Sequence, residues 1–475
     1  METDYLIIGA GASGMAVADE IIEHSSADVV LVDRRADPGG HWVDAYPFVR
    51  LHQPSAFYGV GSTPLGDDRV QTEGPEAGWY ERASGADIVA YYADVLDHRL
   101  VPSGRVRFLG RHDYLRPLDG TGDDHEIRSV ADGATTTISV RRAVVDATAL
   151  ESSIPLRHDR PFDVADGVDV RPPNELEGDG VAELGDHVVI VGGGKTSMDV
   201  CVWLIDRGVD PEAITWIRPR ESWLVDRGST QPFELSVGML EHQSRLVEAA
   251  ARVESADELA CSMEHLGLMH RIDPTGSATV FRGATISRHE LASLRRVEGV
   301  IRGVRVRAVH HARLEVTAVD GADAADVAIP RGATVVDCTA AGLGTPDPSP
   351  IFAPGRIRVQ MTTTGVVPWS AAMIGYVATL DLPLDEKNRV CPALPRTGTI
   401  DALLRSVSTG VELDARRRAN PELAAWNAAT RLNPGRSIPE FVATPAGQEA
   451  FERLVRHVDD ACRNAARLVG ETASL

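Results

Sequence analysis

Short apolar runs alternate with helix-like stretches from the start of the chain. The run DYLIIGA at 4–10 passes through glycines into a small-residue stretch from Ser13 to about His24, and the run DVVLVD follows at 28–33. Apolar runs of this length separated by a helical pattern are typical of βαβ units, and such units build parallel sheets. The pattern predicts an α/β protein.

The same order returns later in the chain. HVVIVGG at 187–193 precedes the helical pattern TSMDVCVWLIDRG and the strand AITWIR at 213–218. Further strands are expected at 105–111, 142–150 and 333–342, and the last two contain the similar segments VVDATA and VVDCTA. We interpret these two segments as crossings between domains, so that the second unit is inserted in the first.

Other patterns predict the remaining elements. Residues 234–270 look helical, Ser287 is placed to cap a helix, and 300–319 alternates like an antiparallel strand pair. Ser370 is expected at the N-cap of a helix within 367–380. The C-terminal stretch predicts a helix packed on its own domain, with a subunit interface as the lesser alternative, through one apolar face formed by Phe451, Leu454, Val455, Val458, Ala461, Ala465 and Leu468.

Composition narrows the function classes. A chain of 475 residues is long enough for two domains, and its net charge of -21 with no basic run argues against nucleic acid and membrane surfaces as partners. The five cysteines form no close pair, which favours a reducing compartment and gives no metal-ligand spacing. No basic leader precedes the first strand, and no apolar run reaches membrane-spanning length, so we expect a soluble cytoplasmic protein.

The first glycine turn has the spacing of a dinucleotide site. Gly9, Gly11 and Gly14 form GxGxxG between a strand and a helix, and Asp33 ends the next strand. These glycines permit the tight turn, the close approach of a pyrophosphate and the packing of the helix, while the carboxylate suits ribose hydroxyls. Two neighbours, Ser13 and Arg34, complete this part of the predicted cofactor site.

The stretch after this acid indicates which dinucleotide binds. DRRADPGGHW at 33–42 resembles the GG-x-W segment of two-dinucleotide flavoproteins through Gly39, Gly40 and Trp42. The resemblance implies FAD in the first turn, with His41 and Trp42 near the isoalloxazine. A tryptophan in the core is the alternative for Trp42.

The second glycine turn suggests a phosphorylated nicotinamide nucleotide. Gly192 and Gly194 supply the turn, Thr196 follows, and Ser197 replaces the third glycine. Lys195 would gain an anionic partner if a phosphate docked there, although a solvated lysine is the alternative. The next strand ends in WIRPR rather than an acid, so one of two arginines is expected to bind a 2′-phosphate and favour NADPH over NADH: Arg218 or Arg220.

The order of motifs resembles class B flavin-dependent monooxygenases over most of the chain. The resemblance implies reduction of FAD by NADPH, formation of a C4a-(hydro)peroxyflavin with O₂, and oxygenation of a small substrate. VRLHQPSAFYGV at 49–60 resembles the segment beside the flavin, so His52, Gln53 and Ser55 are its candidate polar groups, with His52 and Gln53 the catalytic candidates and Gln53 also a cofactor contact. A loop histidine and a capping serine are the alternatives.

Two departures shift the expected chemistry. The FxGxxxH fingerprint of Baeyer–Villiger members is absent from 151–176, and the ATG-like returns read ATA and TAAG. N-hydroxylation of an amine or amino acid is therefore favoured, with resemblance to the branch that oxidises aspartate toward nitrosuccinate. A flavin oxidoreductase that does not oxygenate, a Baeyer–Villiger or S-oxygenating enzyme, and a redox-sensing NADP-binding protein stay open, as does a homo-oligomer, whereas a disulfide reductase is disfavoured by the cysteine spacing.

These inferences give a domain plan with two Rossmann-like dinucleotide-binding domains, the NADP domain inserted in the FAD domain, and a helical C-terminal segment. We expect the first part of the FAD domain at 1–155, the NADP domain with a helical insertion at 156–335, and the FAD-domain return with the C-terminal helices at 336–475.

Overall fold

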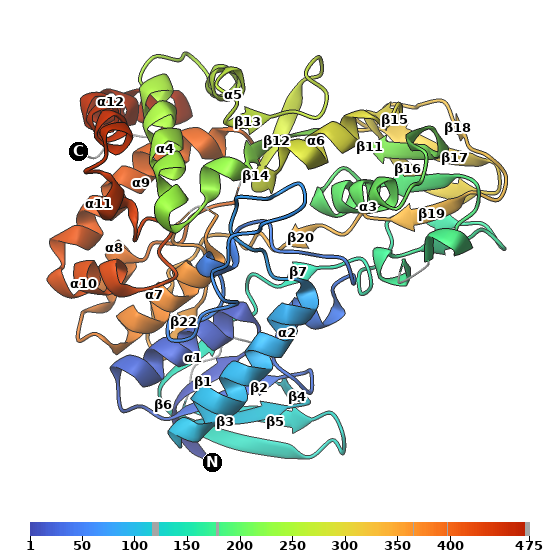
Figure 1. The fold of residues 1–475 in the computed structure, drawn as a ribbon. Helices are drawn as coiled ribbons and strands as arrows, with labels where there is room; N and C mark the ends of the chain where they lie inside the picture. Colours follow the sequence, from blue (N-terminus) through green and yellow to red (C-terminus); the bar gives the residue numbers. More distant parts are fainter. Residues whose placement is uncertain (116–122, 177–179, 364, 397, 471–475) are drawn as a thin grey trace.

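Two separate sheets dominate the computed structural model, and the first is mixed whereas the second is parallel. It describes residues 1–115, 123–176, 180–363, 365–396 and 398–470. In Figure 1 the first sheet lies near the N-terminus around β1 and β2, and the second lies around β11 and β19. Helices from the middle and the end of the chain gather at a third corner of the molecule.

The first sheet contains eight strands, and its main path runs β21-β22-β6-β1-β2-β3. β1 pairs in parallel with both β2 and β6, and β22 pairs in parallel with β6, so a strand from late in the chain joins strands from its beginning. The strands are β1 (Glu2–Ile8), β2 (Val29–Asp33), β3 (Val106–Gly110), β4 (His112–Tyr114), β5 (Asp124–Ser129), β6 (Thr135–Asp146), β21 (Phe352–Ala353) and β22 (Arg356–Arg358).

The second sheet has five strands in the order β15-β11-β10-β19-β9, and all of its pairings are parallel. Its central strand β10 is buried along its whole length, as the continuous apolar run VVIV predicts for a strand covered on both faces. The strands are β9 (Val170–Arg171), β10 (Val188–Val191), β11 (Ile214–Arg218), β15 (Gly299–Arg302) and β19 (Thr334–Asp337).

Smaller sheets complete the strand content. Antiparallel β16 and β17 extend the region of the second sheet, and β7 pairs with β20 where the two crossings of the chain meet. These strands are β7 (Ser152–Ser153), β8 (Asp163–Val164), β12 (Glu221–Asp226), β13 (Met269–His270), β14 (Ala278–Ile286), β16 (Val304–His310), β17 (Arg313–Ala318), β18 (Val327–Ala328) and β20 (Gly342–Leu343).

Helices pack on the sheets and on one another. α1 (Ala12–His24) lies directly against α7 (Val367–Thr379), and a Cβ added at Gly375 would stand 3.0 Å from the backbone of Val17. The glycine therefore lets the two helix backbones approach closely. The other helices are α2 (Gly85–Asp94), α3 (Lys195–Asp206), α4 (Ser236–Ala250), α5 (Ala256–His265), α6 (Arg288–Arg295), α8 (Leu384–Val390), α9 (Asp401–Ala419), α10 (Pro421–Ala429), α11 (Ile438–Phe441) and α12 (Pro445–Val469).

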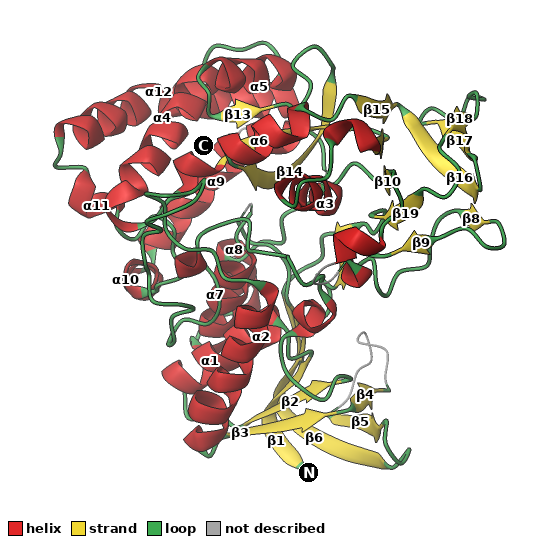
Figure 2. Cartoon of the chain, turned by 45° about the vertical axis from the view of Figure 1, so that its right-hand side comes forward, coloured by secondary structure: helices red, strands yellow, loops and turns green. Residues whose placement is uncertain are grey.

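The C-terminal helices α9 and α12 pack against helices of the inserted region. Figure 2 shows α12 beside α4, and one hydrophobic cluster joins residues of α4 and α5 to residues of α9 and α12. The end of the chain therefore contributes to a helical layer shared with residues 236–265.

Most predicted elements are confirmed. Strands occupy 106–110, 135–146 and 334–337, helices occupy most of 234–270, and Ser287 forms a capping box with Glu290. The stretch 300–319 contains the antiparallel pair β16–β17, although its first residues join the second sheet as β15. The mixed α/β fold is confirmed, whereas the boundaries at 155 and 335 stay a prediction.

Two local expectations are wrong. Ser370 is not an N-cap, because α7 already begins at Val367 and Ser370 lies buried in its first turn, where its hydroxyl accepts the Thr362 N–H. The predicted apolar face of α12 is only partly covered, since Ala461 and Ala465 are buried while Phe451 and Val455 are 45% and 56% exposed.

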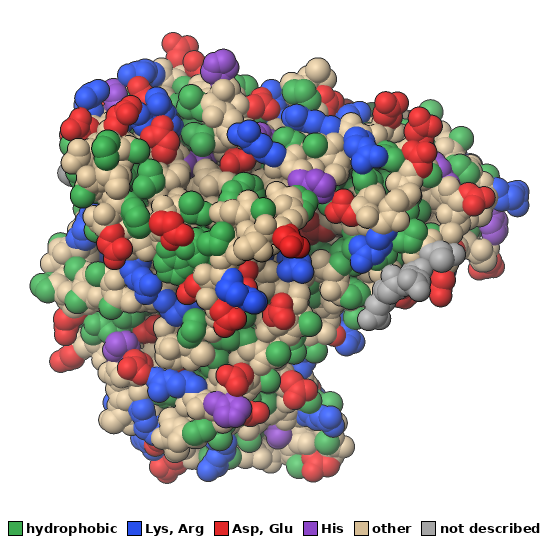
Figure 3. All heavy atoms as spheres, viewed as in Figure 1, with side chains coloured by type: hydrophobic (Ala, Val, Ile, Leu, Met, Phe, Trp, Pro, Cys, Tyr) green, Lys and Arg blue, Asp and Glu red, His purple; other side chains and the backbone are tan. Residues whose placement is uncertain are grey.

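The surface mixes both charges. On the face drawn in Figure 3, acidic and basic side chains are interspersed. Within the part of the chain that the structure describes, no helix combines the length and apolar character needed to span a bilayer.

Candidate functional site

The first turn, residues 9–14, connects β1 to α1 at the carboxyl end of the strand. Gly9 has φ +100°, which favours glycine, and a Cβ added at Gly14 would lie 1.8 Å from the Gly9 carbonyl oxygen. The start of α1 therefore rests directly on the turn. A side chain at Gly14 would force the helix and the turn apart.

A second glycine segment covers this turn. The Gly39 N–H donates to the Ala10 carbonyl at 2.9 Å, and a Cβ added at Gly40 would lie 2.8 Å from the Gly11 Cα. The GG-x-W motif thus acts first through its backbone, which packs against the glycine turn. We call residues 38–42 the cover loop.

Asp33 supports the first turn. Its two carboxylate oxygens accept the Ala10 N–H at 2.7 Å and the Arg35 N–H at 2.8 Å, and the residue is buried. Its predicted contact with ribose hydroxyls stays a prediction, as does the role of Ser13, which is buried in α1. Arg34, the next residue, is exposed.

A cavity of about 760 Å³ lies beside the end of β2. Both Arg35 and Arg157 form ion pairs with Asp44, at 2.8 and 2.9 Å. Burial raises the pKa of Asp44, but the hydrogen bonds from Arg157 and Arg35 outweigh burial and leave it below its usual value. The wall combines cationic and anionic groups, including Arg34, Arg35, Asp44, Glu151, Arg157 and His158.

His41 and Trp42, the last two residues of the cover loop, are partly buried. The Trp42 indole N–H donates to the Tyr58 hydroxyl at 2.7 Å, and their rings meet edge to face. Burial, with the nearby Arg35 charge, lowers the pKa of His41 to about 4. His41 is therefore neutral at pH 7, so it can present an uncharged ring to an adjacent group.

The second turn, residues 192–197, connects β10 to α3 in the same manner. Gly192 has φ +135°, and a Cβ there would lie 2.4 Å from the Cys338 carbonyl oxygen. Gly194, by contrast, is exposed, and a Cβ there meets no described atom within 4 Å. Ser197 is buried and donates to the Gly194 carbonyl at 2.7 Å, while Thr196 is partly buried.

Lys195 has protein carboxylates as partners. Its ammonium forms ion pairs with Asp199 and, at 3.3 Å, with Glu290, and its side chain is 10% exposed. Two nearby anions offset the unfavourable position of a cation in the first turn of a helix. The alternative of a solvated lysine is therefore wrong, whereas a contact between Lys195 and a phosphate stays a prediction.

The two arginines after β11 lie in different environments. Arg218 is 1% exposed, stacks over Trp216 and forms an ion pair with Glu221 at 2.5 Å, so it is a core residue. Burial lowers the pKa of Arg218. Arg220 is exposed and its backbone lies next to Gly193, because a Cβ on that glycine would stand 3.2 Å from the Arg220 carbonyl oxygen. Only Arg220 is available to an incoming ligand, which corrects the inclusion of Arg218.

His52 and Gln53 lie where the two units meet. The His52 carbonyl accepts the Arg227 Nε–H at 3.1 Å and the Thr285 hydroxyl, both from the inserted region. Burial, together with the charge of Lys195, lowers the pKa of His52 to about 4. Gln53 donates to the Phe57 carbonyl at 3.4 Å and is partly buried.

Ser55 has a backbone partner. Its hydroxyl accepts the Ala83 N–H at 2.8 Å, and the residue is buried. This contact fixes the segment beside it and gives Ser55 a structural position.

A chain of alternating charges holds this junction together. Arg82 pairs with Glu76, Glu76 with Arg227, Arg227 with Glu290 at 2.8 Å, and Glu290 with Lys195. Asp199 then connects Lys195 to the Tyr46 hydroxyl, which donates to it at 2.7 Å. We call these seven residues the junction network: Tyr46, Glu76, Arg82, Lys195, Asp199, Arg227 and Glu290.

The junction network encloses the segment that carries His52. Arg82 also donates to the Leu51 carbonyl at 2.7 Å, next to the His52 carbonyl that Arg227 holds. The sequence patterns did not identify Arg227, Glu290 and Arg82, because these residues contact others up to 175 positions away. The i, i+4 spacing of Lys195 and Asp199 was a usable signal.

Arg431 was also missed. It is a partly buried residue of the C-terminal part that donates to the carbonyls of Ala56, Tyr58 and Val60, at 2.8 to 3.1 Å. Burial lowers its pKa. This one side chain therefore fixes the backbone just after Gln53.

Two cysteines meet inside the second unit although they are far apart in sequence. Cys201 and Cys338 belong to one hydrophobic cluster beneath the second turn, and burial raises the pKa of both thiols. Buried thiols with raised pKa values are poor nucleophiles. Their position in this core does not supply the dithiol that a disulfide reductase needs.

Comparison with known proteins supports the prediction of a dinucleotide site at the first turn. Residues 7–50 match a family of NAD(P)-binding Rossmann-like domains. Uncharacterized protein Rv2000 of Mycobacterium tuberculosis and Uncharacterized protein Mb2023 of Mycobacterium bovis are each 38% identical to the chain over 434 residues, which are 91% of this chain and 78% of theirs. The chain belongs to the same family as these mycobacterial proteins.

Solved structures show a similar fold. A cyclohexanone monooxygenase mutant from Rhodococcus sp. Phi1, bound to NADP+, aligns with TM-score 0.52 and 15% identity over 87% of this chain and 91% of that chain. An open crystal structure of cyclohexanone monooxygenase aligns with TM-score 0.50 and 16% identity over 94% and 98%. At this identity the similarity establishes the two-unit architecture.

Proposed function

We propose that this protein is an NADPH- and FAD-dependent monooxygenase that hydroxylates the nitrogen of a small amine or amino acid. The observation that carries the proposal is the presence of two glycine turns, each following a parallel strand of its own sheet, of which the first is covered and the second is open. A covered turn suits a cofactor that stays bound, and an open turn suits one that exchanges.

The residues of the first turn fit FAD. Gly14 leaves no room for a side chain, the cover loop approaches the turn through glycine backbone, and a cavity of about 760 Å³ extends from the end of β2. Backbone N–H groups at a helix start suit a pyrophosphate. Under this proposal residues 1–155 and the return from 336 hold the flavin, with Trp42 and neutral His41 near its ring system.

The residues of the second turn fit NADPH. The open space at Gly194 admits a pyrophosphate to the start of α3, and the exposed Arg220 is placed beside the same turn to meet a 2′-phosphate. The cyclohexanone monooxygenase that shares this architecture is described as bound to NADP+.

The protein would position the reactants and exclude water. Bound FAD supplies the redox chemistry by which NADPH reduces O₂, so that one oxygen atom enters the substrate and the other leaves as water. Arg227, Thr285 and Arg431 hold the backbone around His52 and Gln53. His52, neutral at pH 7, then offers an uncharged polar ring rather than a cation.

A direct assay tests the proposal. The purified protein is expected to be yellow. With an amine substrate it should consume NADPH and O₂ and form an N-hydroxylamine that is 16 mass units heavier than the amine. Aspartate is the first compound to test in a series of amino acids and amines. Reoxidation by O₂ without any oxygenated product would support a non-oxygenating flavin oxidoreductase. A colourless protein that does not retain added FAD would exclude both enzymes.

Arg220 gives a sharper test of the nucleotide. We expect Arg220→Ala to raise the KM for NADPH about tenfold, the usual loss for a charged hydrogen bond, and to leave the KM for NADH almost unchanged. Arg107→Ala, an exposed change on β3 of the first sheet, is the matched control. An equal effect on both nucleotides would show that Arg220 does not bind the 2′-phosphate.

A further inference from the structure

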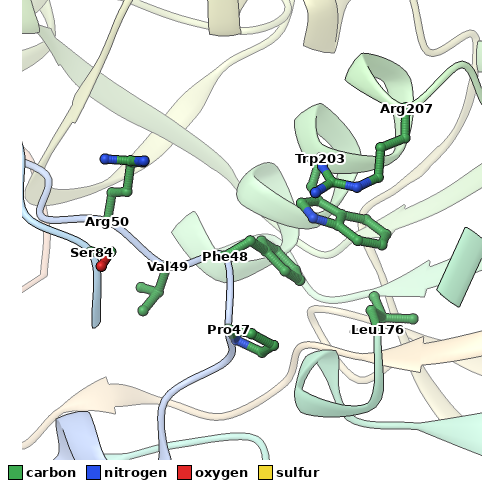
Figure 4. A pocket seen from close by; sticks show the side chains of 8 residues that line it. All are labelled: Pro47, Phe48, Val49, Arg50, Ser84, Leu176, Trp203 and Arg207. Atoms are coloured by element: carbon green, nitrogen blue, oxygen red, sulfur yellow. The ribbon is translucent and has the colours of Figure 1, made fainter. Parts of the chain in front are cut away.

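A second cavity lies next to α3 and to the residues that follow Tyr46. It measures about 410 Å³ and opens between residues 47–50 and the C-terminal part of α3, as Figure 4 shows. This size falls within the usual range of small-molecule sites. Its lining is Pro47, Phe48, Val49, Arg50, Ser84, Leu176, Trp203 and Arg207.

An aromatic pair forms part of its wall. The rings of Phe48 and Trp203 stack with centroids 4.8 Å apart and an interplanar angle of 24°. Phe48 precedes the segment that carries His52, whereas Trp203 belongs to α3. Trp203 is only 6% exposed, because both Phe48 and Arg207 stack on its ring, so the partly exposed Phe48 supplies most of the aromatic surface of the cavity. Such surface favours a flat, apolar ligand body.

Two guanidinium groups flank this aromatic pair. Figure 4 shows Arg50 on one side of Phe48 and Arg207 beside Trp203, over whose ring Arg207 stacks at 4.2 Å. Both arginines are exposed, and Arg50 donates to the Arg82 carbonyl at 3.0 Å. Among the residues that the structure describes, no carboxylate forms an ion pair with either one.

This combination is unusual in a chain of net charge -21. Two cations without described carboxylate partners, placed around one cavity, attract an anion and orient it, while Phe48 contacts its body. From this we propose that the cavity is a binding site for an aromatic carboxylate.

The site is separate from the second glycine turn. Arg207 follows the last residue of α3, and the turn lies at its first residue, so the twelve residues of the helix, about 18 Å long, lie between them. The inference therefore does not rest on the proposed enzymatic function. A ligand there would contact both residues 47–50 and α3. The hydrogen bond from the Tyr46 hydroxyl to Asp199 connects the same segment of the chain to α3.

Calorimetry with a defined probe tests the site. We expect 2-naphthoate to bind the protein as purified, and the neutral 2-naphthamide, which has the same ring system, to bind at least about tenfold more weakly because it lacks the charge. Arg50→Gln and Arg207→Gln should each weaken naphthoate binding about tenfold and leave naphthamide binding unchanged. Arg107→Gln, on β3 of the first sheet, should change neither.

Each result bears on the inference. Loss of naphthoate binding in the double variant, which combines Arg50→Gln and Arg207→Gln, would support it if the melting temperature and the flavin content are unchanged. Equal binding of naphthoate and naphthamide, equal binding by the double variant and the native protein, or no naphthoate binding at millimolar concentration would overturn it. Competition by NADPH in the native protein would also overturn it, because it would place the probe at the second turn.

Discussion

The two glycine turns share a sequence pattern and differ in what surrounds them. At the first turn the cover loop lies so close that a Cβ at Gly40 would stand 2.8 Å from Gly11, and Asp33 accepts two backbone N–H groups. At the second turn Gly194 has open space in front of it, and Lys195 is held by carboxylates.

This difference shows that the motif determines the backbone of the turn but not its accessibility. Gly9 and Gly192 both have positive φ, and both helices start directly after their turns. Accessibility depends on residues outside the motif: the cover loop lies against the first turn, whereas no described atom lies within 4 Å of a Cβ at Gly194. Only the surroundings distinguish a retained cofactor from an exchanged one.

The largest effect is expected from Gly14→Ala. The added methyl would lie 1.8 Å from the Gly9 carbonyl oxygen, so the backbone must move, at a cost of more than about 3 kcal/mol. We expect the variant to lose bound flavin and to melt at a lower temperature, measured by absorbance and calorimetry. A variant that keeps its flavin would show that the first turn is not the flavin site.

Arg227→Ala comes next in magnitude. Arg227 is fully buried and pairs with Glu76 and Glu290, so its removal leaves one partly buried and one buried carboxylate without their shared partner. The expected loss in free energy of unfolding is about 3–5 kcal/mol, measured by denaturant titration. The change also frees the His52 carbonyl, so we expect a fall in kcat for the fraction that folds.

A more exposed arginine on α4 supplies the control for that variant. Arg245 forms ion pairs with Glu241 and Glu248 on α4, and Arg245→Ala should cost less than about 1 kcal/mol. Similar losses for the two variants would contradict a special role for the junction network.

The turns themselves were predictable because their signals are local. A glycine pattern between an apolar run and a helical pattern lies within fifteen residues, so the positions of Gly9, Gly14 and Gly192 followed from the sequence. The same holds for the strands and for the capping box at Ser287. The match to the flavoprotein segment located the cover loop but did not reveal that its glycines contact the turn.

The environment of the site was not predictable from local patterns. The partners of Arg227 and Arg431 lie 151 and more than 370 residues away, and nothing near either residue identifies them. The choice between Arg218 and Arg220 depended on burial, which two arginines separated by one proline do not reveal. The exposed Phe451 and Val455 show the same limit, because a helical period identifies a face but not how much of it is covered.

Lowering the pH should weaken the folded state through three histidines. Burial lowers the pKa values of His41, His52 and His242 to about 4, from 6.5 in the unfolded chain. Between pH 6.5 and 4 the unfolded chain binds these protons and the folded protein does not, so stability falls as the pH decreases through this range. We expect a loss of about 1–2 kcal/mol per histidine between pH 7 and 5.

Denaturant titration at the two pH values measures this loss. His52→Gln and His41→Gln should each reduce the difference between pH 7 and pH 5, which separates the contribution of the junction from that of the cover loop. The prediction fails if stability is unchanged or rises between pH 7 and pH 5.

The smallest effect on stability, and the sharpest use of the comparison, is expected from Gly194→Ala. Gly194 is extended, at φ -91° and ψ -179°, and its added methyl meets no described atom, so the only expected loss is that of a weaker N-cap, less than about 1 kcal/mol. The methyl would, however, occupy the open space through which a pyrophosphate approaches α3. We therefore expect an unchanged melting temperature and flavin content, with a KM for NADPH raised about tenfold, which corresponds to about 1.4 kcal/mol. Comparing the flavin content and the NADPH KM of Gly194→Ala with those of Gly14→Ala would show whether the two turns hold different cofactors. A Gly194→Ala variant that loses flavin and keeps its KM for NADPH would show that the second turn, not the first, holds the flavin.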